Sequence, residues 1–595
     1  MVLVRRALLA CVLLFSTLVY ADIDLRPLPA GQWDERHAAH LLSRAGFGGT
    51  PDEVAALHRM GLAGAINHLL EARDSDTQFD RSGVFDPGLD PFPPSRPATT
   101  RMAKARGEAL GVKVKAGGNR PLQPVVNKFF YWLRASRLET DRVAYWWADR
   151  MVAGEAPLQH KMALFWHGHF ATNEDKVRDY RKMLKQLRLL QDQGLGNFRD
   201  LLIGVAQDPA MLVFLDAGVN TKDSPNENFA REIMELFTMG VGNYGERDVQ
   251  EAARAFTGWD VDGLDFVVNQ QAHDSATKEF LGRSGPFDGV EVIDIILQQP
   301  VTAEFIAGKI YRYFVSEDLD AVGAQQLGRL LRDVNYDISA YLRAIFSARE
   351  FYLPGHIGSR IKGPVELMIS TYRLLDLERA PGVPDFNVVA GALGQRLMHP
   401  PTVAGWSHGR SWITPSLMFE RGNFVLDVLY PDIGFVAPDR YPGYTAEIVN
   451  VQNRLRQGMS VSQATKPTGI TGGEDMMAAS NLLADRDEEF NTRLGSMRGW
   501  QMALERVKPL SRHTARLRLT AEVTAAELSS PREVVDYYAQ KFFAVQPDGE
   551  VLDQLSQHLE EELGTPDIDA AISYLEEPLR NMLHAMLSLP EYQLG

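Results

Sequence analysis

The sequence predicts a mainly α-helical fold, a large multi-helix assembly with a short β-hairpin or irregular insert and a helical C-terminal subdomain. Apolar residues recur every three to four positions in most segments, as in NFRDLLIGVAQ and PVELMISTYRLL, and this spacing places them on one face of a helix. Residues 258–289 lack that periodicity, and within them residues 264–268 read as one arm of a hairpin. Amphipathic segments then continue to the C-terminus.

The length and composition indicate several packed units. The 595 residues exceed the roughly 250–300 over which a single hydrophobic core grows, and 45% hydrophobic with 23% charged residues is typical of a folded globular protein. The predicted divisions are a signal peptide at 1–21, N-terminal helices at 22–73, an excursion rich in Pro, Gly and basic residues at 74–122, a main helical domain at 123–430, a loop or linker at 431–475 and a C-terminal helical subdomain at 476–595.

The first 21 residues have the form of a secretory signal. Arg5 and Arg6 precede an apolar run over residues 7–19, and small residues follow at Val19 and Ala21. The run is about 13 residues long, whereas a membrane-spanning helix needs roughly 20. We therefore expect cleavage before Asp22, export to the periplasm or the medium, and no stable transmembrane anchor.

Cleavage would also remove Cys11, the single cysteine of the chain. The exported protein would then form no disulfide and use neither a thiolate ligand nor a cysteine nucleophile. The formal net charge of −15 disfavours nucleic acid as a partner, because such binders usually carry a basic surplus. The sequence contains no Walker phosphate loop, and no dinucleotide fingerprint in a strand–helix–strand context.

Each predicted element has a local reason. Among residues 22–73, Thr50-Pro51-Asp52-Glu53 is a capping box with proline in the first turn. Residues 74–122 lose periodicity and gather proline and glycine, which indicates an excursion. Helical periodicity returns over 122–256 in aromatic-rich segments, and it returns again after residue 289. Residues 395–445 are loop-like and rich in Pro, Gly and Trp.

The segment from Ser224 to Gly240 predicts a well-capped helix. Ser224 is the expected cap, Glu227 closes a capping box and Gly240 ends the helix. At about 100° per residue, Glu232 lies at the edge of the apolar stripe, while Arg231 faces away from it.

This helix supplies the first candidate catalytic residues. We expect Glu232 to be the general acid or base and Arg231 to orient substrate, with Asn226 and Asn228 binding substrate. The alternative is that Glu227 only caps the helix and that its other polar residues form solvated pairs.

Two irregular segments carry the other candidates. His273 and Asp274 join an imidazole to a carboxylate, and we expect a proton carrier and a second catalytic carboxylate there, with Lys278 binding substrate. Trp406 and Trp412 lie in a loop with little helical tendency and can stack on a sugar. The alternatives are a turn-forming Asp with a surface His, and a tryptophan loop that holds two domains together.

Three histidines in HKMALFWHGHF raise the question of metal. In a continuous helix His167 and His169 lie about 200° apart and cannot chelate one ion, whereas His160 and His167 share a face. No acidic residue stands within one turn to complete a zinc signature. We therefore expect hydrogen-bonded core histidines, and we predict no metal and no other cofactor.

Several blocks in one order resemble the bacterial family catalogued as domain of unknown function 1800. The blocks are KMALFWHGHFAT, NFRDLLIGVAQDPAMLVFLD, NENFAREIMELFTMGVGNY, EAARAFTGW, HDSATKEFLG, IKGPVELM and HPPTVAGWSHGRSWI. The resemblance implies a large exported bacterial protein and carries over no reaction. It draws attention to the matching positions Asn226, Glu227, Asn228, Arg231, Glu232, His273, Asp274, Lys278, Lys362 and Trp406.

Three functional hypotheses follow. The first is an exported hydrolase of an extracellular or cell-envelope polymer, with polysaccharide favoured, that uses carboxylate acid/base chemistry. The second is a non-catalytic envelope or secretion-associated binding protein, in which the same polar groups form a core network. The third is a metal-dependent oxidoreductase that uses His160, His167 and nearby carboxylates.

Overall fold

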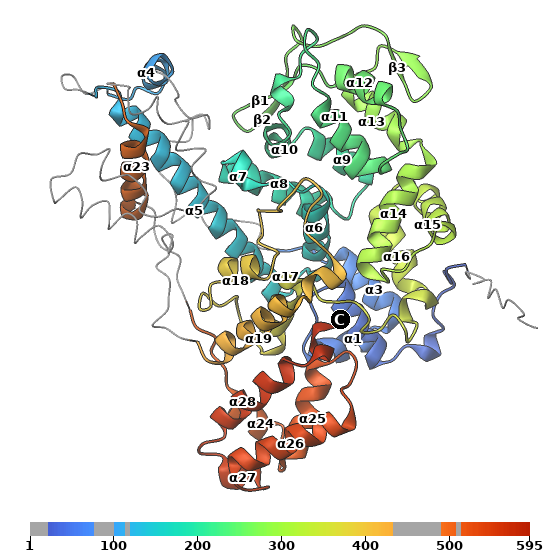
Figure 1. Ribbon diagram of the computed structural model, residues 1–595. Coiled ribbons are helices and arrows are strands. Elements are labelled where there is room, and N and C mark those ends of the chain that lie inside the picture. The colour runs from blue at the N-terminus through green and yellow to red at the C-terminus, as the bar shows by residue number, and fades with distance from the viewer. Residues whose placement is uncertain (1–21, 76–99, 114–119, 432–488, 507–512) are drawn as a thin grey trace, which may run out of the picture.

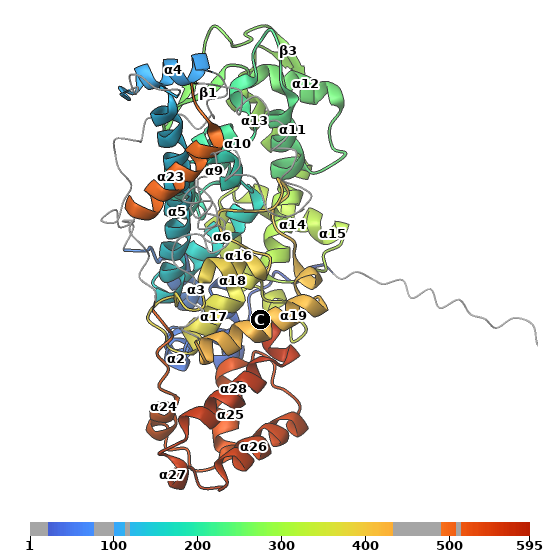
Figure 2. The ribbon, with the colours of Figure 1, turned by 60° about the vertical axis from the view of Figure 1, so that its left-hand side comes forward.

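The computed structural model describes residues 22–75, 100–113, 120–431, 489–506 and 513–595. This part of the chain is mainly α-helical, and its strands form two small two-stranded sheets. The predicted fold class is therefore confirmed. Figures 1 and 2 show an elongated molecule with the strands near one end and the last helices at the other. None of the described helices is long and apolar enough to cross a membrane.

The N-terminal helices begin where their capping residues stand. Asp34 caps α1 (Glu35–Ala45), and its side chain accepts a hydrogen bond from the His37 backbone N–H. Thr50 and Glu53 form the expected capping box at the start of α2 (Pro51–Arg59), which α3 (Gly61–Glu71) follows.

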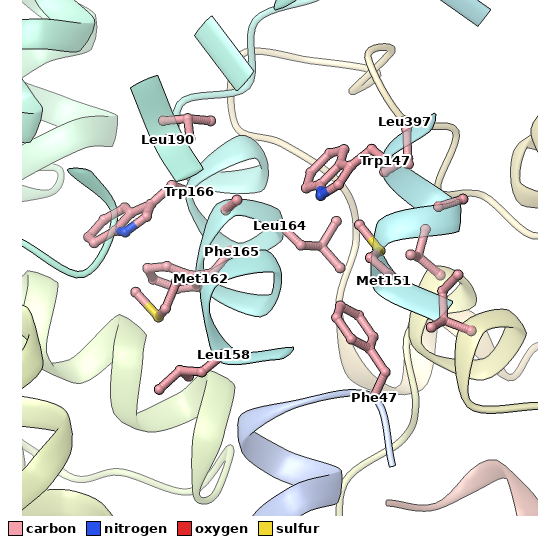
Figure 3. Packing of buried hydrophobic residues seen from close by; sticks show 14 of the residues in the cluster. Phe47, Trp147, Met151, Leu158, Met162, Leu164, Phe165, Trp166, Leu190 and Leu397 are labelled. Atoms are coloured by element: carbon pink, nitrogen blue, oxygen red, sulfur yellow. The ribbon is translucent and has the colours of Figure 1, made fainter. Parts of the chain in front are cut away.

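The centre of the molecule is built around two helices. Helix α5 (Gln123–Ala153) is 31 residues long, and α6 (Pro157–His169) is buried along nearly its whole length. Figure 3 shows Leu164 of α6 facing Trp147 and Met151 of α5, with Trp166 directed to the opposite side of α6. Because α6 carries apolar side chains all round, it packs with neighbours on every side. Helices α4 (Thr100–Ala109), α7 (Glu174–Val177) and α8 (Tyr180–Gln193) lie before and after this pair in the chain.

The end that carries the strands contains the predicted insert. Strand β1 (Trp259–Asp262) pairs antiparallel with β2 (Asp265–Val268), with Trp259 opposite Val268, and β2 falls within the expected hairpin arm. Strands β3 (Lys278–Phe280) and β4 (Arg283–Gly285) form the second pair. The helices of this end are α9 (Phe198–Ala206), α10 (Pro209–Phe214), α11 (Glu227–Met234), α12 (Glu246–Ala255) and α13 (Gly289–Leu297).

Six further helices connect this end to the lower part of the molecule in Figure 1. They are α14 (Pro300–Phe314), α15 (Ala321–Asp333), α16 (Ile338–Ser347), α17 (Pro364–Leu374), α18 (Phe386–Ala392) and α19 (Pro415–Leu429).

The C-terminal region is divided between two places. Helix α23 (Thr492–Arg506) lies along α5, as both ribbon views show. The last helices form a separate group at the opposite end from the strands: α24 (Leu519–Ala525), α25 (Pro531–Phe542), α26 (Gly549–Leu563), α27 (Ile568–Ala571) and α28 (Glu576–Leu587). The predicted subdomain 476–595 thus contains one helix that packs elsewhere. The predicted excursion contains α4, and nearly all of the predicted linker 431–475 lies outside the described residues.

The final residues return to the body of the molecule. Arg421 Nη1 donates to Gln593 Oε1 at 3.0 Å, and Lys362 Nζ donates to the Tyr592 carbonyl at 3.0 Å. Lys362 is among the positions picked out by the resemblance, and its burial lowers its pKa to about 7. Its contact is with the backbone of the C-terminal turn, so in this structure it holds that turn in place.

Candidate functional site

An open groove of about 580 Å³ lies at the start of helix α11. Three of the four residues expected to act on this helix line it, namely Asn226, Asn228 and Arg231. The complete lining is Val219, Ser224, Pro225, Asn226, Glu227, Asn228 and Arg231. Amide, carboxylate and guanidinium groups thus face solvent together, which suits a ligand rich in hydroxyl groups.

Asn226, rather than Ser224, caps helix α11. The Asn226 side chain accepts a hydrogen bond from the Asn228 backbone N–H at 2.9 Å, and the helix begins at Glu227. Ser224 is held in a turn instead, because its N–H donates to the Thr221 carbonyl at 3.0 Å. Asn220 Oδ1 accepts from the Asn226 N–H at 2.9 Å and so fixes the entry to the helix.

Arg231 is held between two carboxylates. Its Nη2 lies 2.9 Å from Glu227 Oε2 and 2.7 Å from Glu246 Oε2, and its Nη1 donates to Glu246 Oε1 at 2.9 Å. The hydrogen bonds that Arg231 donates to Glu246 raise the pKa of Arg231. The guanidinium is therefore oriented at the rim of the groove with its charge compensated inside the protein.

Glu232 is half-buried, as its position at the edge of the apolar stripe predicts. Burial raises its pKa, the Glu235 carboxylate raises it further, and Arg231 opposes both. Glu232 lies one turn after Asn228 on the same side of the helix, so it stands close to the groove. Glu235 accepts a hydrogen bond from the Tyr244 hydroxyl at 2.6 Å. Glu232 and Glu235 thus lie one turn apart in sequence and interact electrostatically, although neither side chain lines the groove.

Helix α11 changes to a π-helical turn immediately after Met234. The turn η4 spans Glu235–Met239, and Thr238 Oγ1 donates to the Ile233 carbonyl at 2.6 Å. His169 Nε2 lies 3.1 Å from the Phe237 carbonyl, and Lys309 Nζ donates to His169 Nδ1 at 3.1 Å. Single π-helical turns occur frequently at functional sites.

The electrostatics around this turn fix the tautomer of His169. Burial and the Lys309 charge lower the pKa of His169 well below its usual value, and burial lowers the pKa of Lys309 to about 8. Because the ammonium donates to Nδ1, the ring proton is on Nε2, and it bonds the Phe237 carbonyl. The polar chain from Lys309 to Phe237 fixes the turn that carries Glu235.

His273, Asp274 and Lys278 lie elsewhere, in the segment that packs on α12. Arg254 Nε donates to Asp274 Oδ2 at 2.8 Å, and Lys278 Nζ donates to the Asp274 carbonyl at 2.6 Å. His273 Nδ1 lies 2.9 Å from the Thr257 carbonyl. Burial alone would raise the pKa of Asp274, but the hydrogen bonds from Arg254 and the Ala276 N–H, together with the nearby positive charges, outweigh it and the pKa falls. None of the three lines the α11 groove.

Both candidate tryptophans are buried. Trp406 and Trp412 are each 4% exposed. The Trp406 ring meets His167 edge-on at 5.1 Å, and the Trp412 ring meets His408 at 5.7 Å. In this structure the two rings contact the protein interior and present no face on which a sugar can stack.

This loop also contains a sequence pattern that is not among the candidates above. Residues 405–409 read Gly-Trp-Ser-His-Gly, the spacing of a nucleophile elbow, in which a strand leads to the serine and a helix follows it. Here Ser407 is exposed, and Gly409–Trp412 forms only a single 3₁₀ turn. No strand of the described sheets leads into it. The setting of a serine-hydrolase elbow is therefore missing in the described part of the chain.

The histidines of α6 point into the interior. His160 Nε2 lies 3.0 Å from Asp74 Oδ2, and His167 Nε2 accepts from the Met398 N–H at 3.0 Å. His169 bonds Phe237 as described above. Each histidine thus has a hydrogen-bond partner in the core, and His160 and His167 contact different residues.

A cluster absent from our sequence-based candidates lies beside a second pocket. Glu174, Asp175 and His399 come together although more than 220 residues separate the histidine from the two carboxylates. Asn173 and Asp175 line an adjacent pocket of about 460 Å³. The sequence gives one local indication of this cluster. His399 precedes Pro400-Pro401 in a loop that also carries tryptophan, histidine and arginine side chains.

The fold and these sites define a large helical protein with a polar groove and a partly buried carboxylate–imidazole cluster. A family model described as "Protein of unknown function (DUF1800)" matches residues 40–594, nearly the whole chain, so the chain belongs to this family. No curated protein and no solved structure matches the chain.

Proposed function

We propose that this protein is an exported hydrolase that binds a hydroxyl-rich polymer, with polysaccharide favoured, in the α11 groove and cleaves it with Glu232 and Glu235. One observation carries the proposal: a half-buried carboxyl group of raised pKa stands next to a second carboxylate, one turn from a polar groove. In known hydrolases a carboxyl group of raised pKa acts as the acid beside a second carboxylate.

The proposed chemistry assigns one role to each group. Glu232, whose pKa is raised by burial, donates a proton to the leaving oxygen of the glycosidic bond. A water molecule adds to the anomeric carbon and gives its proton to Glu235, so the glycosidic bond breaks and one water is consumed. Glu235, and not Asp274, is the second carboxylate, because Glu235 interacts with Glu232 from the next turn, whereas Asp274 is bound to Arg254.

Export is part of the proposal. It is supported by the two arginines, the apolar run of residues 7–19 and the small residues before Asp22. The intact mass of the protein from the periplasm or the medium tests it. A chain that starts at Asp22 is expected, and a retained Met1 contradicts export by signal-peptide cleavage.

The Glu232→Gln variant tests the catalytic proposal. We expect the mature protein to release new reducing ends from one member of a polysaccharide panel, and the variant to be slower by about 10²–10⁴-fold. Glu279→Gln is the matched control, since the Glu279 side chain is 61% exposed and pairs with the exposed Arg247. It should retain full activity. Full activity of Glu232→Gln would contradict the assignment.

A second candidate function is polymer binding without cleavage. This function is favoured by the pairing of Arg231 with Glu227 and Glu246. The two carboxylates already neutralise the Arg231 charge, so this cation does not stabilise charge on a reacting substrate. In that case a polysaccharide retards the protein in affinity electrophoresis without being cleaved. Glu232→Gln then changes the melting temperature only, and Asn228→Ala weakens the retardation.

A further inference from the structure

Two distant segments bring three potential metal ligands to one place. Glu174 and Asp175 begin the short helix α7, and His399 lies in the loop after α18. Each of the three side chains offers one ligand atom, and these atoms all lie within 4.8 Å of one another.

The imidazole of this cluster is buried, and neither of its ring nitrogens makes a regular hydrogen bond within the described residues. The His399 side chain is 7% exposed. Its Nδ1 lies 3.5 Å from Asp175 Oδ2, at the distance of an ion pair and at the limit of a hydrogen bond. Burial of a polar group without a hydrogen bond is costly, so such a group calls for a ligand or a function.

The carboxyl group of Glu174 is also buried with an oxygen that lacks a hydrogen bond in the part of the chain that the structure describes. Glu174 is 1% exposed, and its Oε2 accepts no hydrogen bond from the described residues. Its nearest cation is Arg137, whose Nε lies 3.7 Å away and which also pairs with Asp175. The guanidinium therefore compensates charge in the cluster without satisfying this oxygen.

The backbone fixes the cluster firmly. The Glu174 N–H donates to the Met398 carbonyl at 2.9 Å, and the Met398 N–H donates to His167 Nε2 at 3.0 Å. Asn173 Nδ2 donates to the Pro400 carbonyl at 2.8 Å. Met398 has a φ of 64°, a left-handed conformation that costs a side-chain-bearing residue energy. The fold thus maintains a strained residue directly before His399.

A pocket of about 460 Å³ adjoins the cluster. Asp175 belongs to both, so a ligand in the pocket lies next to the three potential metal ligands. The pocket is lined by Asn173, Asp175, Lys176, Arg178, Phe214, Pro400, Pro401 and Thr402.

We infer that Glu174, Asp175 and His399 bind one divalent first-row transition metal, Zn²⁺ or Mn²⁺, at the edge of this pocket. One imidazole and two carboxylates are ligands that such ions accept, whereas Ca²⁺ and Mg²⁺ prefer oxygen alone. Three protein ligands leave positions open toward the pocket, which is the composition of a site where water or substrate completes the coordination. This inference is independent of the α11 groove and of the proposed hydrolase.

Titration of the metal-free protein with Zn²⁺ or Mn²⁺ tests the inference. The mature protein, purified without a histidine tag and dialysed against a chelator, should bind one equivalent of at least one of these ions by isothermal titration calorimetry. Asp175→Asn and His399→Ala should each weaken binding by at least about tenfold. Asp175 is the first choice because its side chain is 59% exposed, so its substitution leaves the core intact.

Two controls separate this site from other sources of metal binding. His558→Ala removes an exposed histidine of α26 and should leave the affinity unchanged. Glu232→Gln should also leave it unchanged, which keeps the outcome separate from the hydrolase proposal. Absence of binding at millimolar Zn²⁺ and Mn²⁺, or unchanged affinity in Asp175→Asn, would overturn the inference.

Discussion

Arg231 and Asp274 bind opposite ends of the same helix, α12. Arg231 pairs with Glu246, the first residue of that helix, and Asp274 pairs with Arg254, its last residue but one. Eight residues of α-helix correspond to about 12 Å along the axis. The two segments that the sequence suggests as one site are thus two separate features connected by α12.

The Asp274→Asn variant tests whether Asp274 is structural. We expect the loss of its charged hydrogen bond to Arg254 to lower the free energy of unfolding by about 1–3 kcal/mol. Catalytic turnover should be unchanged if Glu235 is the second carboxylate. Urea unfolding and the polysaccharide assay measure the two effects. If the variant had normal stability but no turnover, Asp274 would be a catalytic residue after all.

The Asn226→Ala variant tests the helix cap beside the groove. Loss of the hydrogen bond to the Asn228 N–H should cost about 1 kcal/mol of stability. Asn226→Asp keeps the acceptor oxygen and should restore most of it. Thermal melts of the two variants decide between them, and equal destabilisation by both would show that the amide group has another role.

Helical periodicity predicts much of this fold because it records which face of each helix is buried. In α11, Phe229 and Ile233 are buried and Glu232 is half-buried, as the spacing indicates. The capping box of α2 begins at the expected Thr50. These features depend on residues within a few positions of one another, and a sequence contains that information directly.

Contacts between distant segments could not be predicted in the same way. Glu174 meets His399 because the Met398 backbone bonds both α6 and the start of α7, and no local pattern encodes that meeting. The positions of Trp406 and Trp412 could not be predicted either, because an aromatic-rich loop can face solvent or the core. Trp406 faces the core because its ring packs against His167 and Gly168 of α6.

Trp406→Ala measures how strongly that loop depends on its buried ring. Removing a fully packed tryptophan should lower the free energy of unfolding by about 3–5 kcal/mol. Phe419→Ala is the matched control, because Phe419 is 76% exposed and its loss should have little effect. Urea unfolding compares the two. A variant with normal stability but weakened polysaccharide binding would instead indicate a sugar-stacking role.

The burial of Glu139 predicts that the stability of the protein depends on pH. Its side chain is fully buried on α5, neither oxygen accepts a hydrogen bond in the described part of the chain, and Arg142 Nε lies 3.4 Å from Oε1. Burial raises its pKa to about 7, although the Arg142 charge opposes this.

The sign of the effect follows from this raised pKa. The unfolded chain loses the proton of Glu139 near the ordinary glutamate pKa of 4.5, whereas the folded protein keeps it until about 7. The free energy of unfolding therefore falls as pH rises from 4.5 through 7, and the decrease is complete above that range. Glu139→Gln should remove this contribution and be more stable than wild type by about 3 kcal/mol at about pH 8, but not at about pH 4.

Urea unfolding at several pH values measures the difference between the Glu139→Gln variant and wild type, which isolates Glu139 from other titrating groups. Glu560→Gln, on the exposed face of α26, is the control and should follow the wild-type profile. If the free energies of unfolding of Glu139→Gln and wild type changed with pH in parallel, the raised pKa of Glu139 would be contradicted.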